Sequence, residues 1–375
     1  MKATACVLYE MGLPRPYAES QPLKVEEVDL EGPGEGEVLV ELGAAGLCHS
    51  DLSVIDGARP RPLPMAIGHE AAGIVRELGP GVSDLAEGDH VVMIFVPSCG
   101  SCLPCAEGRP ALCEKAAVAN GEGRLLSGRR PMSRNGQPIN HHMGVAAFSN
   151  YTVCSRRSLV KVDPTLPLEQ AALFGCAVMT GVGAVLNTAR IEPGSSAAVI
   201  GLGGVGLNAL LGARLVGAKV IAIDLVPEKL ALARQLGAFE AFDGKDPDLV
   251  DKVKAASGGG VDFAFEMAGS APALELAYRI TGRGGTTVTA GLAHPSKSIS
   301  IQAVSLVAEE RTLKGSYIGS CVPPRDIPRY IGLFQDGHLP VDRLLSETLG
   351  YGEINAAFDR LADGQAVRQV LLPKQ

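Results

Sequence analysis

The sequence predicts an α/β fold with two parts, one rich in short β-strands and one built on a doubly wound parallel sheet. Three observations support this prediction. At 375 residues the chain is too long for one ordinary core. Up to about residue 177 it contains short apolar segments separated by Gly and Pro clusters. From residue 195 to about residue 318, strand-like and helix-like segments alternate.

The N-terminal part is expected to be irregular β-structure with few helices. Its apolar segments are short, and turn residues bound each of them, which is typical of strands. The expected strands are residues 37–48, 71–78, 89–95 and 149–154. Residues 119–138 are rich in Gly and Arg and show no periodicity, so we expect an ordered surface loop there.

The second part alternates strands and helices, which is the pattern of a doubly wound parallel sheet. The expected strands are residues 197–201, 219–224, 239–242, 261–267, 286–291 and 312–318. The expected helices between them are residues 206–217, 227–237, 247–257 and 271–281. After about residue 321 the sequence predicts two more helices, 326–337 and 352–364, and a final strand, 367–373.

Composition and charge exclude several function classes. No uncharged apolar run reaches the roughly 18 residues of a membrane span. The opening residues MKATACVLYE lack the apolar stretch of a secretory signal, so a cytoplasmic protein is expected. The net charge is -7 and the basic residues are scattered, so neither nucleic acid nor a membrane surface is an expected partner. A small-molecule substrate is therefore the expected binding partner.

The nine cysteines indicate metal rather than disulfides in a chain of this kind. Four of them follow one another at spacings of three, three and eight residues: Cys99, Cys102, Cys105 and Cys113. Four thiolates so close together can close a tetrahedral shell, which leaves no position for a substrate. We therefore predict a structural zinc site. Three other cysteines are expected to be small buried apolar residues: Cys6, Cys154 and Cys321.

A glycine motif follows the first strand of the second part and opens a helix. Its residues are Gly201, Gly203, Gly204, Val205 and Gly206. This context predicts a dinucleotide site, because the glycines allow a tight turn and let backbone amides approach the pyrophosphate. Asp224 ends the next strand. Its carboxylate would bind the ribose hydroxyls but repel a 2′-phosphate, which favours NAD over NADP.

Cys48, His69 and Cys176 are candidate ligands of a second zinc, although no spacing rule connects them. Taken singly each is weak evidence, because an isolated cysteine is more often a core residue and a lone histidine is more often hydrogen-bonded. Together they would form a Cys₂His shell with a free fourth position, which is the arrangement of a catalytic zinc.

These motifs make the chain resemble the zinc-containing medium-chain dehydrogenase/reductase family, and within it the liver-type branch of alcohol dehydrogenases. The similarity extends over essentially the whole length, in the order GHEAAGIV, the four-cysteine segment, FSNYTV, VIGLGGVGL, GGVDFAFE and AVRQVLLP. The resemblance implies a GroES-like catalytic domain over residues 1–177 and a Rossmann domain over residues 178–320. Residues 321–375 would return to the catalytic domain, with the active site in the cleft.

The resemblance also implies roles for residues around the second zinc. The three candidate ligands would bind the catalytic ion, and Asp51 would orient His69 unless it only serves the start of a helix. Glu70 would lie behind the zinc, and Ser50 would receive the alcohol proton. The implied reaction is reversible hydride transfer between a primary alcohol or aldehyde and NAD, with zinc polarising the substrate oxygen.

For the cofactor, the resemblance implies contacts in the glycine motif and elsewhere in the chain. The residues are His49, Thr180, Val205, Asp224, Lys229 and Arg368. Lys229 and Arg368 are equally well interpreted as solvated surface charges. Many relatives place an arginine against the pyrophosphate where this chain has His49, so we expect NAD to be held less firmly here.

The implied substrate pocket has mainly apolar walls, which suit an alkyl or aromatic primary alcohol. Its residues are Phe95, His142, Met143, Leu292 and Tyr317, with Arg59 at the mouth. Arg59 and His142 either recognise a polar group or point to solvent. Glutathione-dependent formaldehyde dehydrogenases of the same branch usually have an acidic residue where Arg59 stands. That alternative activity is therefore less favoured.

Two further expectations follow from the resemblance. Liver-type enzymes often pass the proton on through a histidine where this chain has Ser53, so the route beyond Ser50 must use Ser53, a water or another group. The segment 119–138 resembles a long loop of dimeric relatives that many tetrameric relatives lack, which favours a homodimer, with a tetramer as the alternative. A non-catalytic family member that binds NAD and zinc is the remote alternative, although such proteins typically lack the zinc ligands.

Overall fold

The computed structural model describes residues 1–374, and these form two compact units. The first unit contains Met1–Cys176, Val322–Arg329 and the chain from Leu345 on. The second unit contains Ala177–Cys321 and Tyr330–Leu344. The sequence predicted that residues 321–375 all return to the first part, whereas Tyr330–Leu344 group with the second unit.

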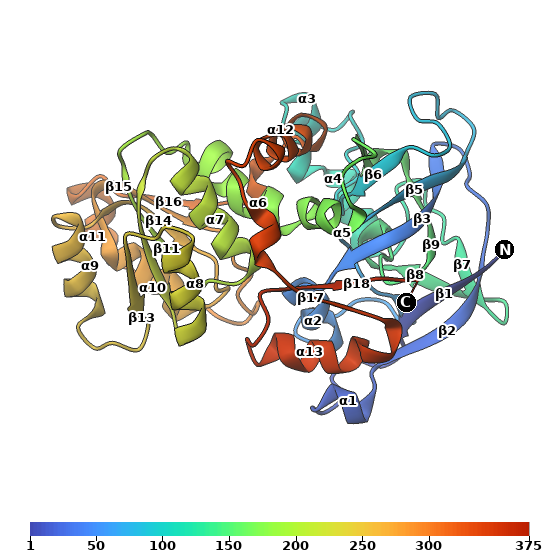
Figure 1. The fold of residues 1–375 in the computed structure, drawn as a ribbon, viewed down its shortest axis with the longest axis horizontal. Helices are drawn as coiled ribbons and strands as arrows, with labels where there is room; N and C mark the ends of the chain where they lie inside the picture. The colour runs from blue at the N-terminus through green and yellow to red at the C-terminus, as the bar shows by residue number, and fades with distance from the viewer. Residues whose placement is uncertain (375) are drawn as a thin grey trace. The chain divides into compact units, whose positions relative to one another are not determined.

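The first unit combines a closed barrel with a seven-stranded sheet (Figure 1). The barrel consists of β1 (Lys2–Leu8), β2 (Leu23–Leu30), β7 (Met132–Arg134), β8 (Gln137–His141) and β4 (Met65–Ala66). The sheet consists of β10 (Leu159–Val162), β6 (His90–Met93), β5 (Ala71–Leu78), β3 (Glu37–Gly46), β18 (Arg368–Leu371) and β17 (Leu345–Leu349), with β9 (Tyr151–Ser155) paired to β3. The four strands expected in the N-terminal part are therefore present, as β3, β5, β6 and β9.

Short helices connect these strands. They are α1 (Tyr17–Ser20), α2 (His49–Ile55), α3 (Leu103–Ala106), α4 (Glu114–Gly121), α5 (Leu168–Ala171) and α13 (Ile354–Ala362). Of these, α13 was expected from the sequence. The others are only one or two turns long, except for the eight residues of α4, and such short elements show little helical periodicity.

The expectation of a surface loop over residues 119–138 was wrong in part. The first of these residues end α4, and β7 and β8 form an antiparallel hairpin that belongs to the barrel. Asn135 and Gly136 form the two-residue turn, with φ of 51° and 76°. Positive φ at both turn residues matches the twist of the adjoining strands, which is why Asn-Gly favours such hairpins.

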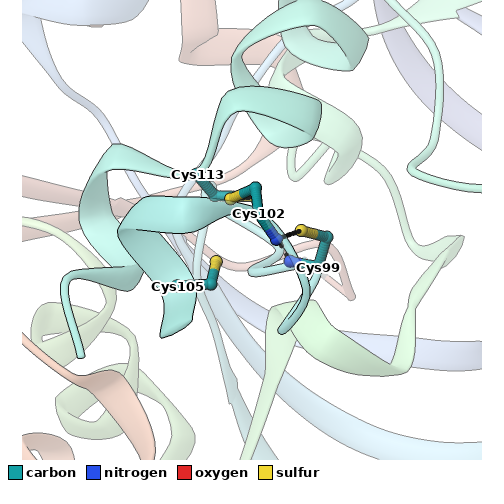
Figure 2. A group of neighbouring side chains, drawn as sticks. All are labelled: Cys99, Cys102, Cys105 and Cys113. Atoms are coloured by element: carbon teal, nitrogen blue, oxygen red, sulfur yellow. Dashed lines mark hydrogen bonds between the residues drawn. The ribbon is translucent and has the colours of Figure 1, made fainter. Parts of the chain in front are cut away.

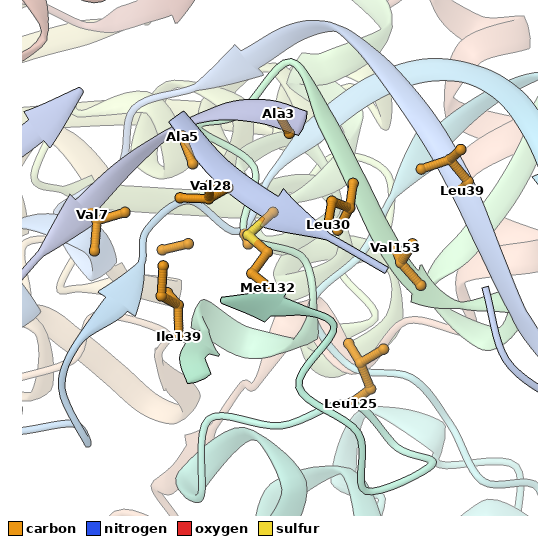
Figure 3. Packing of buried hydrophobic residues seen from close by; sticks show 12 residues of the cluster. Ala3, Ala5, Val7, Val28, Leu30, Leu39, Leu125, Met132, Ile139 and Val153 are labelled. Atoms are coloured by element: carbon orange, nitrogen blue, oxygen red, sulfur yellow. The ribbon is translucent and has the colours of Figure 1, made fainter. Parts of the chain in front are cut away.

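The core of the barrel is filled by alternate residues of its strands. Ala3, Ala5 and Val7 of β1 share one face because side chains alternate along a strand, and all three are buried. Figure 3 shows them packed with Val28 and Met132, from β2 and β7, in one apolar cluster. Leu39 and Val153 of the seven-stranded sheet belong to the same cluster, so the barrel and the sheet share a core.

The second unit is a parallel sheet with helices on its flanks (Figure 1). In sheet order its strands are β13 (Glu240–Asp243), β12 (Lys219–Asp224), β11 (Ser196–Ile200), β14 (Val261–Glu266), β15 (Thr281–Thr289) and β16 (Thr312–Gly315). Its helices are α6 (Ala177–Gly183) with its extension Ala184–Ala189, α7 (Gly204–Leu215), α8 (Pro227–Gln235), α9 (Leu249–Ser257), α10 (Ala271–Ile280) and α11 (Ala303–Ala308). The last helix of this region, α12 (Pro323–Gln335), has residues in both units.

This strand order confirms the predicted doubly wound sheet. All neighbouring strands are parallel, and the order reverses at β11, whose neighbours are β12 and β14. Ligands of such sheets bind at the carboxyl ends of the strands beside that reversal. The glycine motif lies there, because Gly201 directly follows β11.

No single helix within residues 1–374 is both long and apolar enough to cross a membrane. The two helices Leu168–Gly175 and Ala177–Ala189 pass that test only when taken together. Core helices of globular proteins pass it as well, and most of these residues are buried.

Candidate active site

The four closely spaced cysteines come together at the start of two short helices. Cys102 and Cys113 immediately precede α3 and α4, and Cys105 lies within α3. Figure 2 shows the four cysteine side chains close together, and their sulfurs all lie within 4.8 Å of one another. The sulfurs of Cys102 and Cys113 are 3.9 Å apart. That distance is close to the ~3.8 Å edge of a tetrahedron with zinc–sulfur bonds of about 2.3 Å.

Backbone amides prepare this group for a cation. Burial alone would raise the pKa of Cys99, but the amides of Ser101 and Cys102 donate to its sulfur and lower the pKa to about 5. Burial raises the pKa of Cys105 to about 12, and that of Cys113 also rises. Two of the thiols, Cys105 and Cys113, therefore resist ionising without a countercharge, and a divalent cation would remove that cost.

The second candidate metal site is assembled from distant parts of the first unit. Cys48 precedes α2, His69 lies between β4 and β5, and Cys176 follows a 3-10 helix at Ala172–Gly175. The ligand atoms of these residues and of Glu70 all lie within 4.8 Å of one another. Resemblance to a family predicted this grouping, and the structure brings the residues together.

Hydrogen bonds orient the histidine of this site. His69 Nδ1 is 2.9 Å from Oδ1 of Asp51, and both side chains are fully buried. The other oxygen of Asp51 accepts the backbone amide of Cys48 at 3.2 Å, which ties it to the start of α2. Because Nδ1 donates to the carboxylate, Nε2 of His69 presents its lone pair.

Two buried polar atoms of the group formed by Cys48, His69, Glu70 and Cys176 have no hydrogen-bond partner within residues 1–374. They are Nε2 of His69 and Oε2 of Glu70. Leaving such atoms buried and unpaired is unfavourable, so each requires an explanation. The two thiols and the lone pair of Nε2 are the ligand types that zinc prefers, with a carboxylate close behind. The residues present therefore fit a zinc ion with an open fourth position.

Burial and neighbouring charges shift the pKa values of several groups at this site. The Cys176 thiol donates a hydrogen bond to Cys48, which together with His69 lowers the pKa of Cys48 and raises that of Cys176. Burial raises the pKa of Glu70 to about 7, although Arg368 opposes the shift. Burial alone would raise the pKa of Asp51, but its contacts with His69 and His142 outweigh burial and lower it.

Arg368 lies beside Glu70 rather than in solvent. Its guanidinium is 4% exposed, forms an ion pair with Glu70 and donates to the carbonyl of Leu47 at 3.4 Å. The interpretation of Arg368 as a solvated surface charge is therefore wrong. A Cβ at Gly46 would lie 2.7 Å from both Arg368 Nη2 and Glu70 Oε1, so only glycine fits beside this pair. Sequence reasoning missed Gly46, because nothing along the chain marks it.

The glycine motif of the second unit forms a close turn. Gly201 has a φ of +87°, and a Cβ at Gly206 would lie 1.8 Å from the carbonyl oxygen of Gly201. A Cβ at Gly203 would meet nothing within 4 Å. The turn is therefore tight on one side and open on the other, where the amide end of the 12-residue helix α7 is available to an anion. These features fit a dinucleotide pyrophosphate.

The other expected cofactor residues of the second unit lie around this turn. Asp224 ends β12, and its carboxylate accepts the amides of Leu202 at 2.5 Å and Leu225 at 2.7 Å. Gly204 and Val205 begin α7. Thr180 is buried in α6, and Lys229 is half-buried in α8. His49 belongs to the first unit, at the exposed start of α2.

The expected pocket residues fall into two groups. Phe95 and His142 pack edge-on against His69, with ring centroids 5.2 and 5.6 Å away, and Met143 follows His142 in the chain. His142 is fully buried, so its interpretation as a solvent-facing group is wrong. Arg59 is half-buried in the turn after α2. Leu292 and Tyr317 belong to the second unit, where they are 50% and 41% exposed.

The hydroxyls expected to move the proton both lie on α2. Ser50 and Ser53 are half-buried, and Ser53 Oγ donates to the backbone carbonyl of Ser50 at 3.0 Å. The proton of Ser53 is thus engaged with the backbone, while its oxygen can still accept a hydrogen bond.

Two family models match the chain. They are the alcohol dehydrogenase GroES-like domain, over residues 34–164, and the zinc-binding dehydrogenase model, over residues 204–336. A curated relative from Mycobacterium tuberculosis named "Putative alcohol dehydrogenase D" is 38% identical over 99% of this chain and 100% of its own length. The S-(hydroxymethyl)glutathione dehydrogenase of Paracoccus denitrificans is 37% identical over the same shares. The crystal structure of benzyl alcohol dehydrogenase from Acinetobacter calcoaceticus is also similar, with a TM-score of 0.92 and 32% identity over 99% of both chains.

Proposed function

The chain belongs to the zinc-containing medium-chain dehydrogenase/reductase family, and from this premise we propose that it oxidises primary alkyl or aromatic alcohols with NAD. Like other members of this family, the chain has a GroES-like domain and a Rossmann-type domain. The reverse reaction, reduction of the aldehyde, uses the same residues. The observation that supports the proposal best is the buried, unpartnered Nε2 of His69 beside the thiols of Cys48 and Cys176.

The chain itself supplies the ligands and their orientation. Cys48, His69 and Cys176 provide three donors, which leaves a tetrahedral ion one position for a substrate oxygen. Asp51 keeps Nδ1 of His69 protonated and so keeps Nε2 available. When bound, zinc supplies Lewis acidity toward the substrate oxygen, and NAD supplies the hydride acceptor.

We assign the removal of the alcohol proton to Ser50. Its hydroxyl lies on α2, two residues after the zinc ligand Cys48, and it can accept one proton while it releases its own. Ser53 lies one turn further along α2, and its oxygen is available as the next acceptor.

Turnover tests the proposal directly. The assay follows NADH formation with ethanol, hexanol and benzyl alcohol, first with NAD and then with NADP. Activity that increases toward hexanol and benzyl alcohol is the expected result, because Phe95, which packs edge-on against His69, is apolar. Absence of turnover with every alcohol, in protein shown to contain zinc, would contradict it.

S-(hydroxymethyl)glutathione oxidation is the second candidate activity. The relative from Paracoccus denitrificans supports it, at 37% identity over 99% of this chain. Arg59 stands where such enzymes usually have an acidic residue. Formaldehyde assayed with and without glutathione separates the two activities, because only the glutathione adduct should be oxidised by an enzyme of this second class.

We propose that each chain binds two zinc ions and prefers NAD to NADP. The Cys₄ group and the Cys48–His69–Cys176 group each fit one ion. Asp224 presents a carboxylate at the end of β12, where it would repel a 2′-phosphate. Metal analysis should give two zincs per chain. Asp224→Ser should reduce the preference for NAD, whereas Asp243→Ser at the end of the neighbouring strand β13 should leave it unchanged.

We also propose a homodimer joined through the second unit. Within residues 1–374 no strand pairs with the outer side of β16, and the neighbouring helix α11 exposes Val304 and Val307 by 69% and 81%. An open edge strand beside exposed apolar side chains favours a partner. Val307→Glu should shift the molar mass in light scattering from dimer to monomer. Val118→Glu, at another exposed apolar position, should not.

A further inference from the structure

His142 is buried beside the candidate zinc site for a reason that the proposed function does not give. Its side chain is fully buried, and neither ring nitrogen has a well-aligned hydrogen-bond partner within the described chain. An imidazole in such a place loses its hydration without full compensation. An apolar residue would avoid this cost if the position were only a pocket wall.

The ring of His142 lies against the pair formed by Asp51 and His69. Its Nδ1 is 3.1 Å from Oδ1 of Asp51, the same oxygen that lies 2.9 Å from Nδ1 of His69. The two imidazole rings meet edge-on at 84°. Since Oδ2 of Asp51 accepts the amide of Cys48, the carboxylate is approached from three sides.

The backbone adopts an unfavourable conformation next to His142. Met143 and Ala146 both have a φ of 50°, although neither is glycine. The carbonyl of His142 accepts the amides of Val145 at 3.1 Å and Ala146 at 3.2 Å, which closes a tight turn. Left-handed conformations at non-glycine residues cost free energy and persist where the surroundings require them. Here the turn places the imidazole on Asp51.

We propose that His142 is a positioning residue of the catalytic zinc site, where its Nδ1–H is a second donor to Oδ1 of Asp51. The 3.1 Å distance already lies in the range of a hydrogen bond, so a small rotation of the ring aligns the donor. His142 thereby restrains the carboxylate that fixes the tautomer of His69. The inference depends on the proposed function only in that His69 is a zinc ligand.

Three substitutions separate this role from a structural one. His142→Asn places an amide nitrogen near the position of Nδ1, and His142→Gln places one near that of Nε2. His142→Phe keeps a planar ring without a donor. Zinc affinity is measured by competition with a chelator, and the Cys₄ zinc of the same molecule serves as the internal control. Cobalt substitution adds the visible spectrum of the Cys₂His site as a second measurement.

We expect His142→Phe and His142→Gln to bind the catalytic zinc about 10- to 100-fold more weakly, as for other residues that orient a metal ligand. His142→Asn should remain close to the wild type in affinity and cobalt spectrum. The proposal is overturned if His142→Phe or His142→Gln matches the wild type in both. If His142→Phe loses the Cys₄ zinc as well and is misfolded, the Asn and Gln variants decide. Equal affinity in those two also overturns the proposal.

These measurements require no substrate. A wild-type protein without alcohol turnover would refute the proposed function, while the contrast between the Asn and Gln variants would still test the role of His142.

Discussion

Two side chains of the candidate metal site each have one polar atom without a hydrogen-bond partner in the described chain. Nε2 of His69 and Oε2 of Glu70 are buried without partners, while the second nitrogen or oxygen of each group is bound, to Asp51 and Arg368. Each residue thus has one atom fixed and one atom available. The hydrogen bond or ion pair of the fixed atom sets the orientation of each side chain, and so it determines where the available atom points.

Gly46 permits the ion pair behind the site, and its replacement should break that pair. In Gly46→Ala the new Cβ would lie 2.7 Å from atoms of both Glu70 and Arg368, so one of the two must move. Breaking a buried ion pair typically costs about 3–5 kcal/mol, so we expect a loss of about 3 kcal/mol in the free energy of unfolding, measured with denaturant. Gly332→Ala, at a position where a Cβ meets nothing within 4 Å, is the matched control. An equal effect of both substitutions would contradict the argument.

Ser50 should affect the rate rather than binding. Ser50→Ala removes the hydroxyl to which we assign the proton of the alcohol, and general acid–base groups typically contribute about 10²- to 10⁴-fold. We expect kcat to fall within that range, with KM for the alcohol and the zinc content little changed. Ser50→Thr keeps the hydroxyl and should restore most of the rate. A kcat for Ser50→Ala close to the wild type would exclude the assignment.

At the scale of elements, the turn between β11 and α7 has two kinds of glycine. Gly206 is required by the protein, because any Cβ there would overlap the carbonyl of Gly201. Gly203 is not required by the protein, because its surroundings are open. If the turn holds a pyrophosphate, glycine is needed at position 203 because the ligand would lie where a Cβ would be.

The two glycines should therefore respond differently to alanine. Gly203→Ala should keep the melting temperature of the wild type but weaken NAD binding, measured by fluorescence titration, at least tenfold, or about 1.4 kcal/mol. Gly206→Ala should lower the melting temperature by several degrees, because about 1 kcal/mol corresponds to roughly 2–4 °C in a unit of this size. Unchanged NAD affinity in Gly203→Ala would contradict the proposed cofactor site.

The elements also show what could be predicted from the sequence. The Cys₄ group was predictable because its spacing is local, and the second unit was predictable because long helices and strands alternate there. The hairpin of β7 and β8 was missed, although Asn135 and Gly136 marked its turn. Strands of three and five residues are too short to show alternation.

The contact between Asp51 and His142 could not be predicted from the sequence, for a different reason. The two residues are far apart in the chain, and their contact depends on how α2 and the turn after β8 pack. The spacing of Cys48, His69 and Cys176 likewise did not show that they meet, so their grouping was suggested by their residue types and supported by the family resemblance. Packing between distant segments leaves no periodic pattern in the sequence.

At the scale of the whole molecule, the first unit is held together by contacts between its earliest and latest segments. Asp359 of α13 accepts the amides of Tyr17 and Ala18 at 2.9 Å, and Nε of Arg15 at 3.1 Å. Burial alone would raise the pKa of Asp359, but these donors outweigh burial and lower it. The carboxylate therefore links α13 to α1.

Because of this link, the free energy of unfolding should decrease at acidic pH. Since the pKa of Asp359 is lower in the folded state, its contribution is complete above the unfolded value of about 3.9 and is lost as the pH falls through the folded value. Asp359→Asn should cost about 1 kcal/mol at pH 7, and the difference from the wild type should shrink below about pH 4. Urea unfolding across pH 3 to 7 measures this. Asp363→Asn, which alters the more exposed partner of Arg15, should have little effect. A difference that stays constant with pH would contradict the role of the charge.

The position of β18 has a consequence for how the protein matures during synthesis. The chain makes Cys48, His69 and Cys176 before any of the second unit, but Arg368, the partner of Glu70, belongs to the last strand. A nascent chain on the ribosome can thus gather the thiols and the imidazole early, yet Glu70 keeps no buried counterion until β18 pairs with β3. The ion pair between Arg368 and Glu70 therefore joins residues 298 positions apart, and it can form only after the whole of the second unit has been synthesised.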